Sequence, residues 1–113
     1  MKTNNLLIAN FLGLETIRFN KEMYLLKWKK NLVQPKDDTI FKFDIDWNWL
    51  MEVLEKIESK NFSIEMNRQE DGDYQCLIIK GDNIIFQTFS NTKIKATYKA
   101  VIKFIKYYNE LDK

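Results

Sequence analysis

Histidine is absent from this sequence of 113 residues. Because imidazole is the commonest general base near neutral pH and a frequent zinc ligand, its absence excludes Ser-His and Cys-His nucleophile pairs and most zinc sites. The single cysteine, Cys76, can form neither an intramolecular disulfide nor a multi-cysteine metal site. No histidine can activate this thiol, so we expect Cys76 to be a small buried residue of a strand. Binding, without catalysis, metal or cofactor, is therefore the expected activity.

Glycine is also scarce, with three residues, and neither GxxxxGK[ST] nor GxGxxG occurs, so no phosphate-binding loop is expected. The aromatic motif of RNA-recognition folds is missing as well. No segment approaches the roughly 20 consecutive apolar residues that span a bilayer, and the first residues lack the apolar run of a signal peptide. The expectation is a cytoplasmic protein that makes no membrane contact.

The chain does contain enough apolar material for a core. Hydrophobic residues make up 45% of the sequence and aromatic residues 14%, which is too apolar for a disordered chain. We therefore predict one domain over residues 1–113. The net charge of +2 gives no overall attraction to nucleic acid, and the basic residues are lysines except for Arg18 and Arg68.

Hydrophobic periodicity and turn residues predict an α+β fold. Helices are expected at 4–12, 47–59 and 92–110, and strands at 16–19, 23–28, 62–68, 74–80 and 84–89. The polar segment 29–39 contains Pro35 and is expected to be a loop, and residues 40–43 are expected to be extended. The resulting order, α-β-β-α-β-β-β-α, favours an antiparallel sheet of three to five strands with one side covered by the long helices.

The middle helix has the clearest pattern. Asp46 is the expected N-cap, because its carboxylate can accept the free N–H groups of the first turn. An apolar stripe follows at helical spacing. It consists of Trp47, Leu50, Met51, Leu54 and Ile57, widened by Trp49 and Val53. In the last helix the corresponding apolar face comprises Ile94, Tyr98, Val101, Ile105 and Tyr108, broadened by Ala96, Ala100 and Phe104.

A row of lysines on the last helix is the leading candidate for a binding site. Lys95, Lys99, Lys103 and Lys106 recur at helical spacing, and Lys93 lies at the helix entrance. Such a stripe suits phosphates or an acidic protein. The alternative is the solvated side of an amphipathic helix.

A second basic cluster comprises Lys27, Trp28, Lys29 and Lys30. Lysines beside an aromatic ring can combine attraction for phosphate with base stacking. The alternative is that Trp28 points into the core, as many aromatic side chains in strands do.

Acidic residues are segregated from these lysines. They cluster on the middle helix and near the first hairpin, at Asp44, Asp46, Glu52, Glu55, Glu58, Glu65, Glu70, Asp71 and Asp73. Their spacing suits neither a metal cage nor a catalytic pair, because the helical carboxylates follow an exposed face. An acidic surface that imitates nucleic acid, or orients a partner, is the more useful interpretation.

Three segments carry a resemblance to a known family: LLIANFLGLE at 6–15, FDIDWNWLMEVLEKIES at 43–59 and TKIKATYKAVIKFIKYYNE at 92–110. They resemble small proteins from phages and prophages of Bacteroidetes-type bacteria, in which the patterns LIAxFMG, SWDWLMPVVEKIE and TKIEAVxxAVVEFIKWYN recur. The chain is similar to the phage ABA-sandwich group, and this resemblance implies a sheet between helical layers. It covers most of the chain except 16–40. Where the family often has glutamates in the last helix, this chain has Lys95 and Lys103.

The resemblance implies a phage or prophage protein that acts in the host cytoplasm. The leading hypothesis is an anti-defence protein, specifically an anti-CRISPR inhibitor that binds an RNA-guided nuclease or its guide RNA complex without catalysis. Three alternatives remain open. They are an accessory protein that binds RNA or single-stranded nucleic acid, a self-assembling structural phage protein, and a protein that sequesters a signalling nucleotide.

Overall fold

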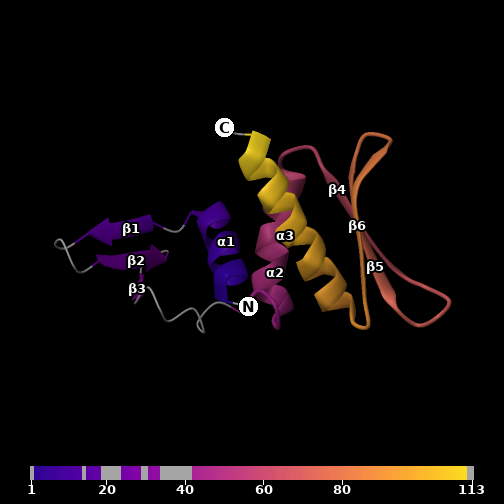
Figure 1. Cartoon of the computed structure of the whole chain (residues 1–113), viewed down its shortest axis with the longest axis horizontal. Coiled ribbons are helices and arrows are strands. Elements are labelled where there is room, and N and C mark those ends of the chain that lie inside the picture. The colour runs from indigo at the N-terminus through magenta and orange to yellow at the C-terminus, as the bar shows by residue number, and fades with distance from the viewer. Residues whose placement is uncertain (1, 14, 19–23, 29–30, 34–41, 112–113) are drawn as a thin grey trace.

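The computed structural model describes residues 2–13, 15–18, 24–28, 31–33 and 42–111. The helices are α1 (Lys2–Leu12), α2 (Trp47–Glu58) and α3 (Lys93–Leu111). The strands are β1 (Glu15–Arg18), β2 (Tyr24–Trp28), β3 (Asn31–Val33), β4 (Ser63–Arg68), β5 (Tyr74–Lys80) and β6 (Asn83–Ser90). The α+β class is confirmed (Figure 1).

Strands β4, β5 and β6 form the predicted antiparallel meander. Met66 pairs with Cys76, which in turn pairs with Thr88, and the pairing of β5 with β6 shifts register between Ile78 and Ile79. Gly72 and Gly81 have positive φ angles of 96° and 62° in the two connecting turns. Because this backbone region is unfavourable for most side chains, the glycines explain why the chain reverses at these positions.

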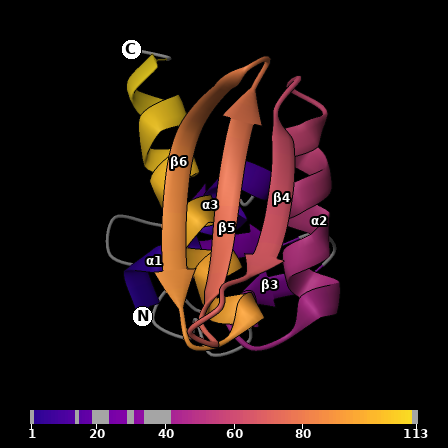
Figure 2. The same cartoon turned by 90° about the vertical axis from the view of Figure 1, so that its right-hand side faces the viewer.

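All three helices lie on the same side of this sheet (Figure 2). Helix α3 packs on β5 and β6, α2 packs beside β4, and α1 contacts α2 and α3. The prediction that the long helices cover one side of the sheet is confirmed. The described helices do not form layers on both sides, which differs from the sandwich that the resemblance implies.

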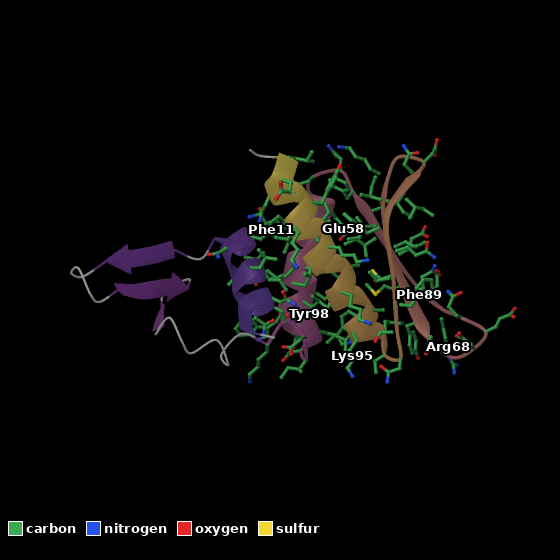
Figure 3. All side chains as sticks on the ribbon, in the orientation of Figure 1. Phe11, Glu58, Arg68, Phe89, Lys95 and Tyr98 are labelled. Carbon is green, nitrogen blue, oxygen red and sulfur yellow. The ribbon has the colours of Figure 1, made fainter. Side chains whose placement is uncertain are left out.

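One continuous core fills the space between the helices and the sheet (Figure 3). Phe104 of α3 lies near its centre, with ring-centroid distances of 4.8 Å to Phe62 and 6.1 Å to Phe11. Both contacts are edge-to-face, an arrangement that aromatic rings favour. Phe104 therefore joins the start of the meander to α1 across the whole core.

Strand β3 corrects one prediction, because residues 29–39 were expected to be a loop. Leu32 of β3 pairs with Lys27, and β1, β2 and β3 form a small antiparallel sheet of their own. A strand of three residues is too short to reveal a two-residue period, so its polar neighbours determined the prediction. The described chain thus has two three-stranded sheets, with one more strand than the predicted order. Residues 34–39 lie outside the described part.

The segment that precedes α2 is a turn rather than the predicted extended stretch. Asp46 N–H donates to the carbonyl oxygen of Lys42 over 2.9 Å, and Phe43 inside this turn is fully buried. The aromatic ring can therefore enter the core without a strand to direct it. Residues 40–41 lie outside the described part.

Helix α2 begins as predicted, because the Asp46 carboxylate accepts a hydrogen bond from the Asn48 N–H over 2.8 Å. Its buried side chains are Leu50, Val53, Leu54 and Ile57. Met51 was wrongly placed in this stripe, since it is 44% exposed. It follows Leu50 by about 100° of helical rotation, which carries it out of the interface.

Helix α3 also buries two residues that the sequence pattern missed, Thr97 and Ile102. The Thr97 hydroxyl donates to the Lys93 carbonyl oxygen over 2.8 Å. This hydrogen bond within the helix satisfies the hydroxyl and permits a polar side chain to be fully buried.

Candidate functional site

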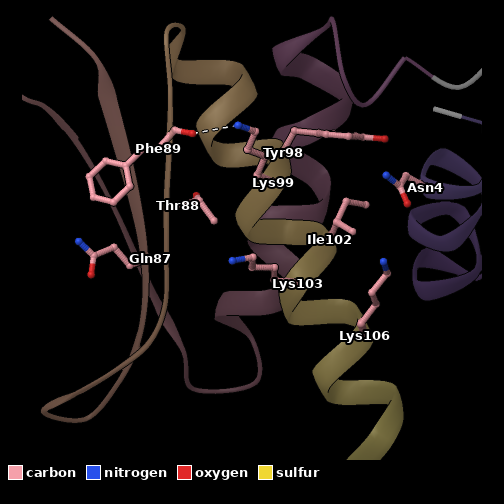
Figure 4. A pocket seen from close by; sticks show the side chains of 9 residues that line it. All are labelled: Asn4, Gln87, Thr88, Phe89, Tyr98, Lys99, Ile102, Lys103 and Lys106. Carbon is pink, nitrogen blue, oxygen red and sulfur yellow. Dashed lines mark hydrogen bonds between the residues drawn. The ribbon is translucent and has the colours of Figure 1, made fainter.

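A groove of about 510 Å³ lies between β6, α3 and α1 (Figure 4). Its lining residues are Asn4, Gln87, Thr88, Phe89, Tyr98, Lys99, Ile102, Lys103 and Lys106. Three of these are lysines, and no aspartate or glutamate is among them. The groove therefore concentrates positive charge in a chain whose net charge is only +2.

The helix wall of the groove follows directly from the sequence spacing. Lys99, Lys103 and Lys106 lie within about 60° of one another around α3, because a helix turns by about 100° per residue. All three are exposed, whereas Ala100 and Val101 on the other side of α3 are fully buried. Burial of that apolar side fixes the rotation of α3 and directs the lysines into the groove.

The strand wall is the outer edge of the large sheet. Strand β6 pairs with β5 on one side, and within the described residues no strand pairs with its other side. Lys99 Nζ donates to the carbonyl oxygen of Phe89 over 3.1 Å (Figure 4). The Thr88 hydroxyl donates to the Ala96 carbonyl oxygen over 2.6 Å and holds β6 against the first turn of α3. Two hydrogen bonds thus set the distance between the strand and helix walls.

The third wall is held by a polar contact between distant parts of the chain. Tyr98 extends from α3 toward α1, and its hydroxyl donates to Asn5 Oδ1 over 2.9 Å. Asn5 is buried, and its amide also donates to the Asp44 carboxylate over 3.4 Å. Asn4, the next residue of α1, lines the groove. The partly buried contact between Tyr98 and Asn5 therefore positions the α1 wall.

The predicted lysine row divides in the structure. Lys99, Lys103 and Lys106 line the groove, and Lys95 is exposed outside the lining. Lys93 precedes Lys99 by six residues and therefore lies about 120° from it around the helix axis. Its ammonium is 5.8 Å from the centroid of the Tyr74 ring, on the β5 side of α3. The structure thus brings three of these five lysines together.

The second predicted cluster falls mostly outside the part of the chain that the structure describes. Lys27 and Trp28 belong to β2, whose backbone is described, but their side chains lie outside the described part. Lys29 and Lys30 lie outside it entirely.

Sequence reasoning missed the groove residues other than lysine. Gln87, Thr88 and Phe89 come from β6 and Asn4 from α1, and no local pattern relates them to α3. Ile102 is an apolar residue between Lys99, Lys103 and Lys106 in the sequence, and the structure buries it at 7% exposure. Tertiary packing, which the periodicity of a single helix does not reveal, assembles this site.

The acidic residues have structural or surface positions. Glu52, Glu55 and Glu58 are exposed along α2, and the Asp71 carboxylate accepts a hydrogen bond from the Asp73 N–H within the first hairpin turn. Among the residues that the structure describes, no group of three potential metal ligands occurs.

Cys76 lies in β5 and is fully buried, as predicted. Burial raises the pKa of its thiol to about 11, and a hydrogen bond with Thr97 offsets part of that rise. Since the thiolate is the reactive form, Cys76 is protonated and unreactive near neutral pH. Its role is to fill the core between the sheet and α3.

Helices long and apolar enough to cross a membrane do not occur in the described ranges. Comparisons with known families, curated proteins and solved structures found no match to this chain.

Proposed function

We propose that this chain is a non-catalytic binding protein that inhibits a nucleic-acid-handling complex by docking on an anionic surface. The observation that carries the proposal is the convergence of Lys99, Lys103 and Lys106 in a groove whose described lining residues include no carboxylate. Low-dielectric walls concentrate the field of clustered charges, so an anionic partner is attracted there more strongly than by scattered lysines.

The distribution of charge supports an oriented contact. Exposed glutamates follow α2, at Glu52, Glu55 and Glu58, whereas the groove lysines belong to α3. Because the charges of α2 and α3 are opposite, an anionic partner is attracted to the lysines of α3 and repelled by the glutamates of α2. This difference favours one orientation of the bound partner.

The family resemblance supplies the biological setting of the proposal. In a phage or prophage, a small inhibitor of this kind acts as an anti-defence protein in the host cytoplasm, here as an anti-CRISPR protein. Its target is an RNA-guided nuclease or its guide RNA complex, and the groove meets an acidic patch of the nuclease protein. Occupation of that surface blocks access of guide, target or catalytic residues.

Two alternatives have their own supporting observations. The groove lysines beside Tyr98 suit an RNA-binding accessory protein, since lysines attract phosphate and aromatic rings stack on bases. The apolar side chains of Ile84 and Phe89 on β6, exposed at 57% and 45%, suit a self-assembling structural protein. Direct RNA binding and concentration-dependent oligomers are their respective signatures.

A pull-down from host lysate, with and without RNase, tests the proposal. The tagged chain is compared with a groove variant that carries Lys99→Glu, Lys103→Glu and Lys106→Glu. The matched control carries Lys42→Glu, Lys80→Glu and Lys93→Glu, which change the same charge at exposed positions outside the groove lining.

The proposal expects one nuclease complex to be retained after RNase by the wild type and the control, but not by the groove variant. Partners that disappear with RNase would instead support the RNA-binding alternative. Equal retention by the two variants would show that the groove is not the contact surface.

A further inference from the structure

We infer that the groove receives an extended acidic segment of the protein partner, which adds to the sheet of β4, β5 and β6 as a strand along the outer edge of β6. This inference rests on the proposed function, because it specifies how the same groove holds its partner.

The edge of β6 offers the backbone groups that strand addition requires. Strand β6 has eight residues and pairs with β5 along its length, and in the described part of the chain its opposite edge has no strand partner. Gln87, Thr88 and Phe89 of this edge line the groove. An extended peptide that enters the groove therefore meets a row of peptide groups, the arrangement used in β-strand addition.

The Lys99 ammonium marks the position that an added strand would take. It donates to the Phe89 carbonyl oxygen from α3, in an exposed hydrogen bond of 3.1 Å. A backbone N–H of an added strand can replace this donor. Lys99 is then released to pair with a carboxylate of the same segment, so one hydrogen bond is exchanged for a backbone hydrogen bond and an ion pair.

The spacing of the lysines matches the repeat of a strand. Lys99 and Lys103 are separated by four residues of α3, which is about 6 Å along the helix axis. Side chains on one side of a strand recur every two residues, about 6.6 Å apart. Carboxylates at alternate positions of the added strand therefore come close to successive lysines of α3.

The two faces of the sheet differ, and this difference predicts an alternating sequence for the bound segment of the partner. Helix α3 lies on one face, so every second side chain of the added strand points toward its lysines (Figure 2). The intervening side chains point to the other face, where the Phe89 ring lies on the side of β6 away from α3 and is 45% exposed (Figure 4). We therefore expect acidic and apolar residues to alternate in the bound segment.

Charge distinguishes this occupant from a second copy of the chain. Two β6 edges that pair with each other would bring two sets of lysines together, and such like-charge contacts oppose edge-to-edge association. An acidic strand instead neutralises the row while it satisfies the same edge.

Binding of model peptides to the full chain tests the inference. The probe is a labelled peptide of alternating Glu and Val, measured by fluorescence anisotropy. One control peptide has Lys in place of Glu. Two further control peptides are N-methylated at alternate residues, one at the odd and one at the even positions. N-methylation removes backbone donors but retains the carboxylates. The protein variants are Lys99→Glu/Lys103→Glu and the matched Lys42→Glu/Lys93→Glu.

We expect the Glu-Val peptide to bind, and N-methylation or the Lys99→Glu/Lys103→Glu change to weaken binding by at least about tenfold. The Lys42→Glu/Lys93→Glu control should change binding by less than about twofold. Strand addition would be overturned if the N-methylated peptides bound as tightly as the unmodified Glu-Val peptide, or if the Glu-Val peptide did not bind. Binding of a single-stranded RNA probe in place of the peptide would overturn it in favour of nucleic acid.

The peptide result and the lysate result separate the two proposals. If the nuclease complex is retained but no acidic peptide binds, only the strand-addition inference fails. If the peptide binds but no nuclease complex is retained, the inhibitor function fails while the groove remains a site for acidic strands.

Discussion

Tyr98 and Asn5 are 93 positions apart in the sequence, yet the tyrosine hydroxyl donates a hydrogen bond to the asparagine side chain over 2.9 Å. This contact joins the first and last helices and positions one wall of the groove. Asn5 also reaches Asp44 in the turn before α2, so the contact links three segments. The lysine groove is thus built on a partly buried polar network rather than on a single helix.

Tyr98→Phe should lower the free energy of unfolding by about 1–2 kcal/mol, because it removes the hydroxyl while Asn5 stays buried. Urea unfolding measures the change. Tyr107→Phe is the control, since Tyr107 is exposed and its ring contact with Phe86 does not need the hydroxyl. A similar loss in both variants would show that the Tyr98–Asn5 hydrogen bond contributes nothing specific.

Leu50→Ala should cost about 2–5 kcal/mol, the usual range for a fully buried leucine. Met51→Ala, the next residue of α2, should cost less than about 1 kcal/mol because Met51 is 44% exposed. Comparing the unfolding free energies of this pair tests the rotation of α2. Equal costs, or a larger cost at Met51, would mean that α2 presents a different face to the core.

Cys76 should make stability depend on pH in the alkaline range. Its folded pKa of about 11 lies above the reference value of 9.0, so the unfolded chain loses the thiol proton first as the pH rises. The stabilisation is complete below about pH 9 and is lost toward pH 11, by up to about 2–3 kcal/mol. Urea unfolding of the wild type and of Cys76→Ala across this range isolates the effect, because lysine and tyrosine titration is common to both. A constant difference between the two proteins would contradict the burial of the thiol.

Salt should weaken binding at the groove. Raising the ionic strength from about 50 mM to about 500 mM shortens the Debye length severalfold, so the affinity for an acidic peptide should fall severalfold. The Lys99→Glu/Lys103→Glu variant should not show this fall, because its two reversed charges repel an acidic peptide and salt screens that repulsion. Affinity that is independent of salt in the wild type would assign binding to the apolar rim of the groove instead.

Much of the fold was predictable because local rules determine it. The Asp46 cap, the glycine turns and the periodicity of α2 and α3 each act within a few residues, and each matched the structure. Strand β3 was not predicted, because three residues are too few to show the two-residue period of a strand. Met51 was misplaced because neighbouring apolar residues blur the edge of a helical stripe.

The groove was predictable only along α3. Lysine spacing identified Lys99, Lys103 and Lys106, since they follow one helical face. Phe89 and Asn4 reach the same groove from β6 and α1 through packing of segments far apart in the sequence. No pattern local to either segment marks it as a wall, so the strand edge beside the lysines became visible only in three dimensions.

The most direct measurement is cleavage of target DNA by a purified RNA-guided nuclease from a Bacteroidetes-type host, with the chain added. We predict that the wild type and the Lys42→Glu/Lys80→Glu/Lys93→Glu control inhibit cleavage, whereas the Lys99→Glu/Lys103→Glu/Lys106→Glu variant does not. Circular dichroism verifies that this variant is folded. Absence of inhibition by the wild type, or equal inhibition by the two variants, would contradict the proposal that the groove lysines bind and block the nuclease.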